Sequence, residues 1–237
     1  MNKKKTFHRI LLFIFLAMIL FIFNVFYGNP LSKYISKKDL EHYLHTHYPD
    51  KDFHLSKGDY VFPFGSYSYK VSEFQGGQES KSKEYEFMIG GAFSRKVRVD
   101  GIYEDNLDPN LMERLGKEAG EEINDLLTQH FSNINYVGAR CAVLKDKLDE
   151  NVKWDKSLDL DELLSINIFL DSRKQSKGEF YKEVTKIQTL LNEHGYNYKG
   201  VIVNGDLLDT KSDTIDWYVK YDIYFTKTQS IKLKDIN

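Results

Sequence analysis

The chain has 237 residues but only one cysteine, Cys141. A single cysteine cannot form an internal disulfide, so the folded part must take its stability from packing. Cys141 lies in residues 137–143, where it shares one face of an alternating stretch with two valines and an alanine. This pattern indicates a buried, small apolar side chain rather than a nucleophile, which needs exposure and a nearby base.

Catalytic signatures are equally scarce. No H-E-x-x-H spacing occurs, and neither G-x-S-x-G nor S-x-x-K occurs in a strand–turn–helix context. Excess positive charge is missing too, because the net charge is −2, and −6 once Lys3, Lys4, Lys5 and Arg9 are set aside. A mildly acidic chain lacks the basic face that neutralises phosphates, so nucleic acid is not an expected partner.

Polar residues are nearly missing from residues 10–27, whose only polar member is Asn24. As a helix, these 18 residues cover about 27 Å, close to the ~30 Å hydrocarbon core of a bilayer. Residues 10–23 are apolar on every face, whereas a helix of a soluble core has one apolar stripe. The sequence therefore predicts a transmembrane anchor at residues 10–27, with the membrane as a partner.

The flanks of this anchor predict its fate and its orientation. No pair of small residues provides an A-x-A-like cleavage site, so we expect the anchor to stay uncleaved. Residues 1–9 carry four cations, and residues 28–38 carry three. The positive-inside rule, and the small influence of charge on long translocated domains, place residues 1–9 in the cytoplasm. The region from about residue 29 is then extracytoplasmic, in a single-pass protein of the cell membrane.

Residues 31–132 form the first of two predicted α+β domains. A helix with an apolar stripe covers about residues 31–48, and Pro49 follows it. The next fifty residues alternate as a meander of three or four antiparallel strands, with a polar loop at residues 75–83. Asp108-Pro109 then begins a long helix, with the aspartate as N-cap and the proline at the first position. Helix, meander and helix would form one compact unit, similar in pattern to cystatin-like and PepSY-like folds.

Residues 135–228 form the second predicted domain, in the order ββαββ. Its helix begins with the capping box Ser176-Lys177-Gly178-Glu179 and ends before Gly195, a residue typical of helix C-termini. The clearest strand is residues 215–225, which alternate without interruption. We expect residues 229–237 to form a frayed tail.

Two short segments point to a known family. Tyr27-Gly28-Asn29-Pro30 directly follows the anchor, and a lysine-rich helix then ends in Tyr48-Pro49-Asp50-Lys51-Asp52-Phe53. Both segments resemble the YfjL-like proteins of Firmicutes. The resemblance covers the anchor and first helix best, and it extends to the second half only in the order of the elements. It implies a membrane-anchored protein of two domains, and it supplies no catalytic residues for this chain.

Two sets of side chains are candidates for metal binding. His42 and His45 are three residues apart on the first helix, so both can face one metal ion. His47 points about 140° away from His42, which leaves this pair without an obvious third ligand. The acidic segment Asp159-Leu160-Asp161 has oxygen ligands for calcium, but it lacks the third ligand and the glycine of a D-x-D-x-D-G loop. Solvated helix and loop surfaces are the simpler interpretation of both.

The sequence thus favours a membrane-anchored, extracytoplasmic α+β protein without catalytic residues or a cofactor. It would act as a binding or interaction module for an envelope protein or peptide. Two alternatives stay open, a metal-dependent envelope hydrolase that uses His42 and His45, and a cystatin-like inhibitor or sensor module.

Overall fold

The computed structural model describes residues 3–73, 83–91, 94–207 and 218–237. The chain divides into two compact units, Met1–Asp105 and Asn106–Asn237. Each unit combines helices with a sheet, which confirms the predicted α+β class, and a long apolar helix comes first.

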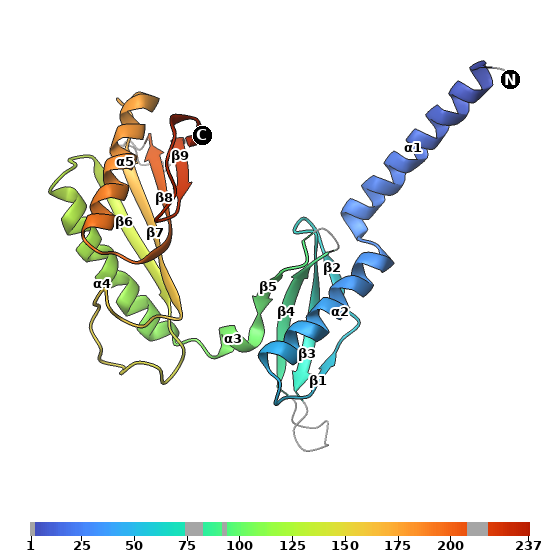
Figure 1. The fold of residues 1–237 in the computed structure, drawn as a ribbon, viewed down its shortest axis with the longest axis horizontal. Coiled ribbons are helices and arrows are strands. Elements are labelled where there is room, and N and C mark those ends of the chain that lie inside the picture. The colour runs from blue at the N-terminus through green and yellow to red at the C-terminus, as the bar shows by residue number, and fades with distance from the viewer. Residues whose placement is uncertain (1–2, 74–82, 92–93, 208–217) are drawn as a thin grey trace, which may run out of the picture. The chain divides into compact units, whose positions relative to one another are not determined.

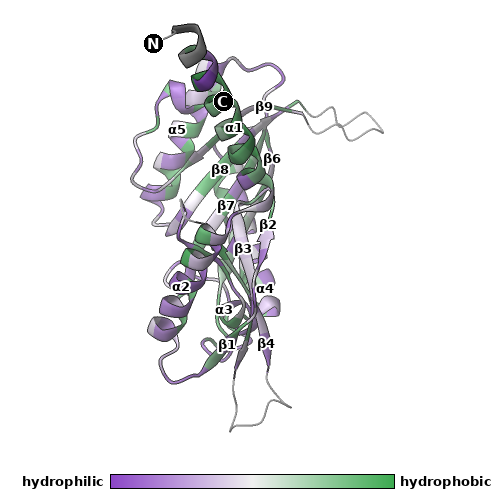
Figure 2. Ribbon diagram, turned by 90° about the vertical axis from the view of Figure 1, so that its right-hand side faces the viewer, coloured by the Kyte–Doolittle hydropathy of each residue, from purple (hydrophilic) through white to green (hydrophobic). Residues whose placement is uncertain are grey.

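The first unit begins with helix α1 (Lys3–Tyr27) and helix α2 (Pro30–His47). Among the described residues, one helix is long and apolar enough to cross a membrane, and α1 supplies its apolar part (Figure 2). Gly28, at φ +68°, separates α1 from α2 in a backbone conformation that favours glycine. Asn29 then caps α2, because its side chain accepts a 2.7 Å hydrogen bond from the backbone N–H of Ser32.

The predicted meander is present in the first unit as one antiparallel sheet in the order β1-β3-β4-β5, with β2 also paired to β3. Its strands are β1 (Phe53–Leu55), β2 (Asp59–Val61), β3 (Ser66–Glu73), β4 (Glu84–Gly90) and β5 (Val97–Asp100), followed by the short helix α3 (Gly101–Asp105). Helix α2 packs Leu40 and Leu44 into the core beside Tyr67, Tyr69 and Phe87. Most of the loop predicted at residues 75–83 lies outside the described residues.

In the described part of the second unit, two α-helices accompany a four-stranded sheet in the order β6-β7-β8-β9 (Figure 1). Its elements are α4 (Pro109–Thr128), β6 (Ile134–Ala142), β7 (Glu162–Asp171), α5 (Lys177–Glu193), β8 (Tyr198–Asp206) and β9 (Val219–Phe225). Strands β7 and β8 are parallel and the other pairs antiparallel, so α5 is the crossover between the two parallel strands. Both helices contribute to the core on one face of the sheet.

The predicted capping signals are confirmed. Asp108 accepts a hydrogen bond from the N–H of Leu111 at the start of α4. Ser176 and Glu179 form a complete capping box at α5, and Gly195 has φ +77° just beyond the last residue of that helix. Strand β9 begins at Val219, and most of the preceding segment that the alternation assigned to this strand lies outside the described residues.

The prediction that the long helix α4 belongs to the first domain, residues 31–132, was wrong. The stripe of α4, including Leu115, Ala119 and Ile123, lies in the core of the second unit, against β6 and β7. An apolar stripe shows that a helix has a buried face, but it does not identify the sheet that covers that face. The predicted frayed tail was also wrong, because Ile231 and Ile236 are buried in the same core around the short 3-10 helix Leu233–Asp235.

Two glycines allow α4 to approach β6 closely. A Cβ atom at Gly116 would lie 2.6 Å from the carbonyl oxygen of Ala139, and one at Gly120 would lie 3.2 Å from that of Val137. The first distance is shorter than van der Waals contact, and its partner is backbone, which cannot rotate away. Gly116 therefore sets the separation between helix and strand.

We predict that Gly116→Ala destabilises the second unit by about 1–3 kcal/mol, because the added methyl group must push α4 away from β6. Both tryptophans of the chain, Trp154 and Trp217, belong to this unit, so urea unfolding followed by tryptophan fluorescence measures the effect. Gly178→Ala in α5 is the matched control, since nothing lies within 4 Å of the added atom. Equal midpoints for the two variants would contradict this account of the helix–strand contact.

Candidate functional site

Strand β6 is the first strand of its sheet, with β7 on one side. On its other edge, the backbone just after β6 is paired with the segment before α4. The N–H of Asp108 donates to the carbonyl of Val143, and the N–H of Lys145 donates to the carbonyl of Asn106. The chain then leaves this edge at Asp108, where α4 begins.

Beyond this point, the edge has no backbone partner in the part of the chain that the structure describes. Backbone groups of alternate residues in a strand point the same way, so Val137, Ala139 and Cys141 present theirs on the edge used by Val143. Among the residues that the structure describes, none pairs with β6 on this edge. Such an edge can template the addition of another strand.

A groove of about 750 Å³ follows this edge, between β6 and α4. Its floor includes the backbone of residues 137–141 together with Gly116 and Gly120, which have no side chains to fill it. Its walls are formed by Met112, Glu113, Lys117 and Glu121 on α4 and by Tyr136 and Arg140 on β6. The groove thus combines an apolar surface with unpaired backbone and a charged rim.

Tyr136 is the most prominent wall residue. Its side chain is 59% exposed although it sits on a strand. Its ring lies along β6 over Gly138, where an added Cβ atom would be 2.9 Å from the Tyr136 hydroxyl. Phe169 of β7 is its aromatic neighbour, with ring centroids 6.0 Å apart. An exposed, laterally supported aromatic ring is a common anchor in protein recognition.

Cys141 lines the inner end of the groove but is 6% exposed. Burial raises the pKa of its thiol, so the neutral form is favoured. Its Sγ lies 4.0 Å from the carbonyl oxygen of Met112, which is its hydrogen-bond partner. The predicted role as a buried apolar residue agrees with this environment.

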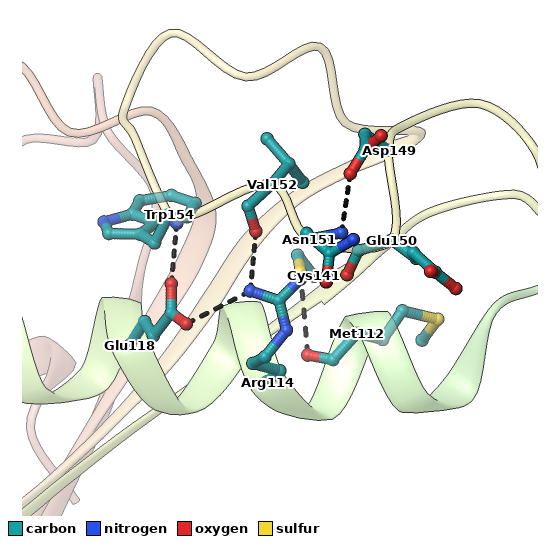
Figure 3. Close-up of polar contacts among 9 residues, drawn as sticks. All are labelled: Met112, Arg114, Glu118, Cys141, Asp149, Glu150, Asn151, Val152 and Trp154. Atoms are coloured by element: carbon teal, nitrogen blue, oxygen red, sulfur yellow. Dashed lines mark hydrogen bonds and ion pairs between the residues drawn. The ribbon is translucent and has the colours of Figure 1, made fainter.

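The charged connector between β6 and β7 is attached to the exposed side of α4 by Arg114 and Glu118 (Figure 3). Arg114 donates 2.6 Å hydrogen bonds to the carbonyls of Val152 and Glu150. Glu118 accepts a 2.7 Å hydrogen bond from the backbone N–H of Trp154 and another from Arg114. The connector therefore fixes the position of α4 from the side away from the groove.

Four acidic side chains of the connector have protein partners. Asp161 accepts hydrogen bonds from the N–H of Leu144 and from Lys147, and Asp159 is 3.4 Å from the same lysine. Asp149 and Asp155 accept from backbone N–H groups two residues further on. This arrangement is that of a mixed-charge surface loop, the simpler of the two interpretations of the sequence.

His42 and His45 lie on the exposed side of α2. Within residues 3–73, 83–91, 94–207 and 218–237, no three His, Cys, Asp or Glu side chains are grouped so as to hold a metal ion. His47 stacks on Tyr43, with ring centroids 3.9 Å apart. Metal binding by His42 and His45 stays a prediction, whose test is the metal content of a variant with both replaced by alanine.

Sequence reasoning missed the groove. The signal was present as Gly116-Lys117-Glu118-Ala119-Gly120, in which two glycines on one helix face interrupt an otherwise favourable helix sequence. Glycines at this spacing permit close backbone approach, but they do not show which element approaches. The identity of the free edge also depends on strand order, which the sequence does not specify.

The fold and the groove define a class of protein: a two-unit α+β protein with an N-terminal apolar helix and a groove between a helix and the edge strand of its second sheet. Residues 3–101 match the family model "YfjL-like, N-terminal domain", and residues 118–237 match "YfjL-like C-terminal domain". The chain therefore belongs to the YfjL-like family, which confirms the resemblance seen in the sequence. It is 28% identical over 230 residues to "Uncharacterized protein YfjL" of Bacillus subtilis (strain 168), with 95% of this chain and 96% of that protein covered. No solved structure matches the chain.

We predict that Glu118→Gln loosens the connector at neutral pH and costs about 0.5–1.5 kcal/mol of stability in the second unit. The backbone N–H of Trp154, and then Arg114, hold the pKa of Glu118 below its ordinary value of 4.5, although desolvation opposes them. A lowered folded-state pKa means that this stabilisation is present above pH 4.5 and is lost as the pH falls through the folded value.

Urea unfolding at neutral and acidic pH, followed by tryptophan fluorescence, measures this difference. The difference in unfolding free energy between the parent protein and Glu118→Gln should disappear as the pH falls, since both side chains are then uncharged. Glu121→Gln is the control, because the ion pair of Glu121 with Lys117 is 3.9 Å long and exposed. A gap that is constant with pH would show that the charge of Glu118 does not hold the connector.

Proposed function

We propose that this protein is a single-pass, membrane-anchored binding module whose second unit captures an extended polypeptide segment outside the cytoplasm. The segment would add to β6 as a fifth strand and lie in the groove beside α4. The observation that carries this proposal is the edge formed by Val137, Ala139 and Cys141, which has no strand partner among the described residues and lines a groove with an apolar wall.

Strand addition suits this geometry for two reasons. Backbone hydrogen bonds to the free edge supply affinity for any extended chain, and alternate side chains of the added strand reach pockets that supply selectivity. The chain itself already uses this edge, because Leu107 and Leu144 form an antiparallel bridge directly beyond β6. A bound segment would pair with β6 along the same edge that residues 106–108 use just beyond the strand.

The contacts at the end of α1 support a retained anchor rather than a cleaved signal sequence. The hydroxyl of Tyr60 in β2 donates a 2.7 Å hydrogen bond to the carbonyl of Val25. The side chain of Asn29, the N-cap of α2, donates to Asn24, the one polar residue of the apolar run. Cleavage within this junction would remove partners of the folded unit. The match of the N-terminal family domain from residue 3 also supports a retained helix.

The charge distribution supports an extracytoplasmic location for both units. Four cations precede the apolar run on a tail of nine residues, while the long region after it is acidic overall. Short positively charged tails are retained in the cytoplasm, whereas long domains cross the membrane largely regardless of their charge.

We predict that peptides selected by the full-length protein in detergent from a library of unstructured, displayed peptides bind through Tyr136. Tyr136→Ser should weaken binding of the selected peptides at least tenfold, about 1.4 kcal/mol, because it removes the aromatic wall of the groove. Fluorescence anisotropy of a labelled, selected peptide measures the affinity.

The matched control is Tyr224→Ser in β9. Tyr224 is 55% exposed, and β9 is the strand at the opposite edge of the same sheet. Its affinity for the peptide should equal that of the parent protein. Failure to enrich any peptide, or equal losses in both variants, would contradict peptide capture at β6.

We predict that intact cells expose residue 153 but not residue 4. In a Cys141→Ser background, a membrane-impermeant maleimide should label Lys153→Cys in intact cells, because Lys153 is on the exposed connector. The same reagent should label Lys4→Cys only after the membrane is permeabilised. The opposite labelling pattern would reverse the orientation, and labelling of both in intact cells would exclude a spanning helix.

A further inference from the structure

The turn between β2 and β3 exposes two large aromatic side chains. Phe62 is 48% exposed and Phe64 is 58% exposed, and Pro63 separates them. The stretch Val61-Phe62-Pro63-Phe64-Gly65-Ser66 contains no charged residue. Neighbouring exposed phenylalanines in a short uncharged turn are costly in water, so a function of this turn requires an apolar partner.

The turn contacts the last helical turn of α1. The rings of Phe62 and Phe26 have centroids 4.7 Å apart. Phe26 is part of the apolar run of 18 residues, whose length of about 27 Å reaches across the ~30 Å hydrocarbon core. In a membrane-spanning α1, Phe26 therefore lies at the boundary between acyl chains and head groups, and its contact places Phe62 at the same depth.

Hydrogen bonds hold this arrangement in place. The hydroxyl of Tyr67, one residue into β3, donates to the carbonyl of Asn29 at 3.0 Å and accepts from the N–H of Asn29 at 3.1 Å. Tyr60 binds the carbonyl of Val25 on the other side of the helix break. The two tyrosines flank the turn in sequence and attach it to both sides of Gly28. The turn is therefore held beside the end of α1.

We propose that the Phe62-Pro63-Phe64 turn is a wedge that inserts into the lipid interface of the leaflet where α1 ends. This inference rests on the proposed anchoring of α1. The argument for lipid is continuity, because Phe62 packs on the helix that would itself be embedded in that lipid. Tyr27, Leu31 and Tyr34 are also exposed around the start of α2. Aromatic residues with one polar end are typical of this zone.

The wedge would give the first unit two points of attachment to the membrane. One helix alone leaves a domain free to tilt and rotate about its exit point. A second apolar contact beside the helix restricts both motions, so the sheet of the first unit takes a defined orientation relative to the bilayer. The first unit would then be a membrane-seated platform rather than a flexible spacer.

The test places an environment-sensitive nitrobenzoxadiazole label on single cysteines in a Cys141→Ser background of the full chain. The labelled positions are Phe64→Cys in the wedge, Ile14→Cys within the apolar run and Asp52→Cys as a control. Asp52 is exposed and lies beyond the other end of β3, because Phe53 pairs with Glu73 while the wedge precedes Ser66. The protein is placed in phosphatidylcholine nanodiscs with and without lipids that carry a nitroxide near the head-group end of the acyl chain.

We expect a blue-shifted emission at position 64 that is quenched by the nitroxide lipid, and neither effect at position 52. If the emission is blue-shifted at position 14 but the emission at position 64 equals that at position 52, the wedge is overturned and the anchor stands. A label at position 14 without a blue shift would contradict the anchor itself, and with it the wedge. A blue shift at position 64 without quenching by lipid would assign the turn to a protein contact and overturn the wedge as well.

Discussion

A β-strand has two edges, and the second unit depends on how those of β6 are occupied. One edge is paired with β7 along the strand. The other is paired only just beyond the strand, by the segment around Leu107, before the chain turns into α4. Because α4 starts at that point, it packs beside the remaining edge instead of pairing with it. The core, the groove and the position of the connector all depend on the point at which the chain leaves the edge of β6 and begins α4.

The close approach of α4 is what makes a strand edge without a strand partner compatible with a stable domain. Gly116 and Gly120 bring the helix against the backbone of β6, while Leu115, Ala119 and Ile123 fill the core between the two layers. On the exposed side of the helix, Arg114 and Glu118 bind the connector. The helix is thus fixed from both sides, and the groove of about 750 Å³ lies between it and β6. Natural proteins usually cover or charge such edges, and α4 covers this one in part, so the groove that remains beside the unpaired strand favours a binding role.

In the first unit, tyrosine hydroxyls hold the junction between α1 and α2. Tyr67 binds the backbone of Asn29, Tyr69 binds the carbonyl of Lys33, and Tyr60 binds the carbonyl of Val25. Three neighbouring strand positions thus hold the end of α1 and the start of α2. A helix break in an apolar environment leaves backbone groups in need of partners, and these hydroxyls supply some of them. The abundance of tyrosine in the sequence has a structural explanation here.

Local signals in the sequence predicted local structure well. The cap at Asp108, the capping box at Ser176 and the alternation of the first meander all describe contacts between residues close in the chain, and all are confirmed. The errors concern contacts between distant residues. The stripe of α4 fits the first sheet as well as the second, and Ile231 and Ile236 look like isolated apolar residues in a polar tail. The groove could not be predicted, because a free edge is defined by strand order and not by the composition of β6.

Backbone amide hydrogen exchange of the full-length protein, with and without a selected peptide, tests the central claim most directly. An added strand must bond to the outward-facing groups of β6. The account predicts that the amide hydrogens of Val137, Ala139 and Cys141 become protected when the peptide binds, while exchange in β9 at the opposite edge stays unchanged. Binding without protection at these three positions would contradict strand addition at β6, and protection confined to β9 would assign the peptide to the wrong edge of the sheet.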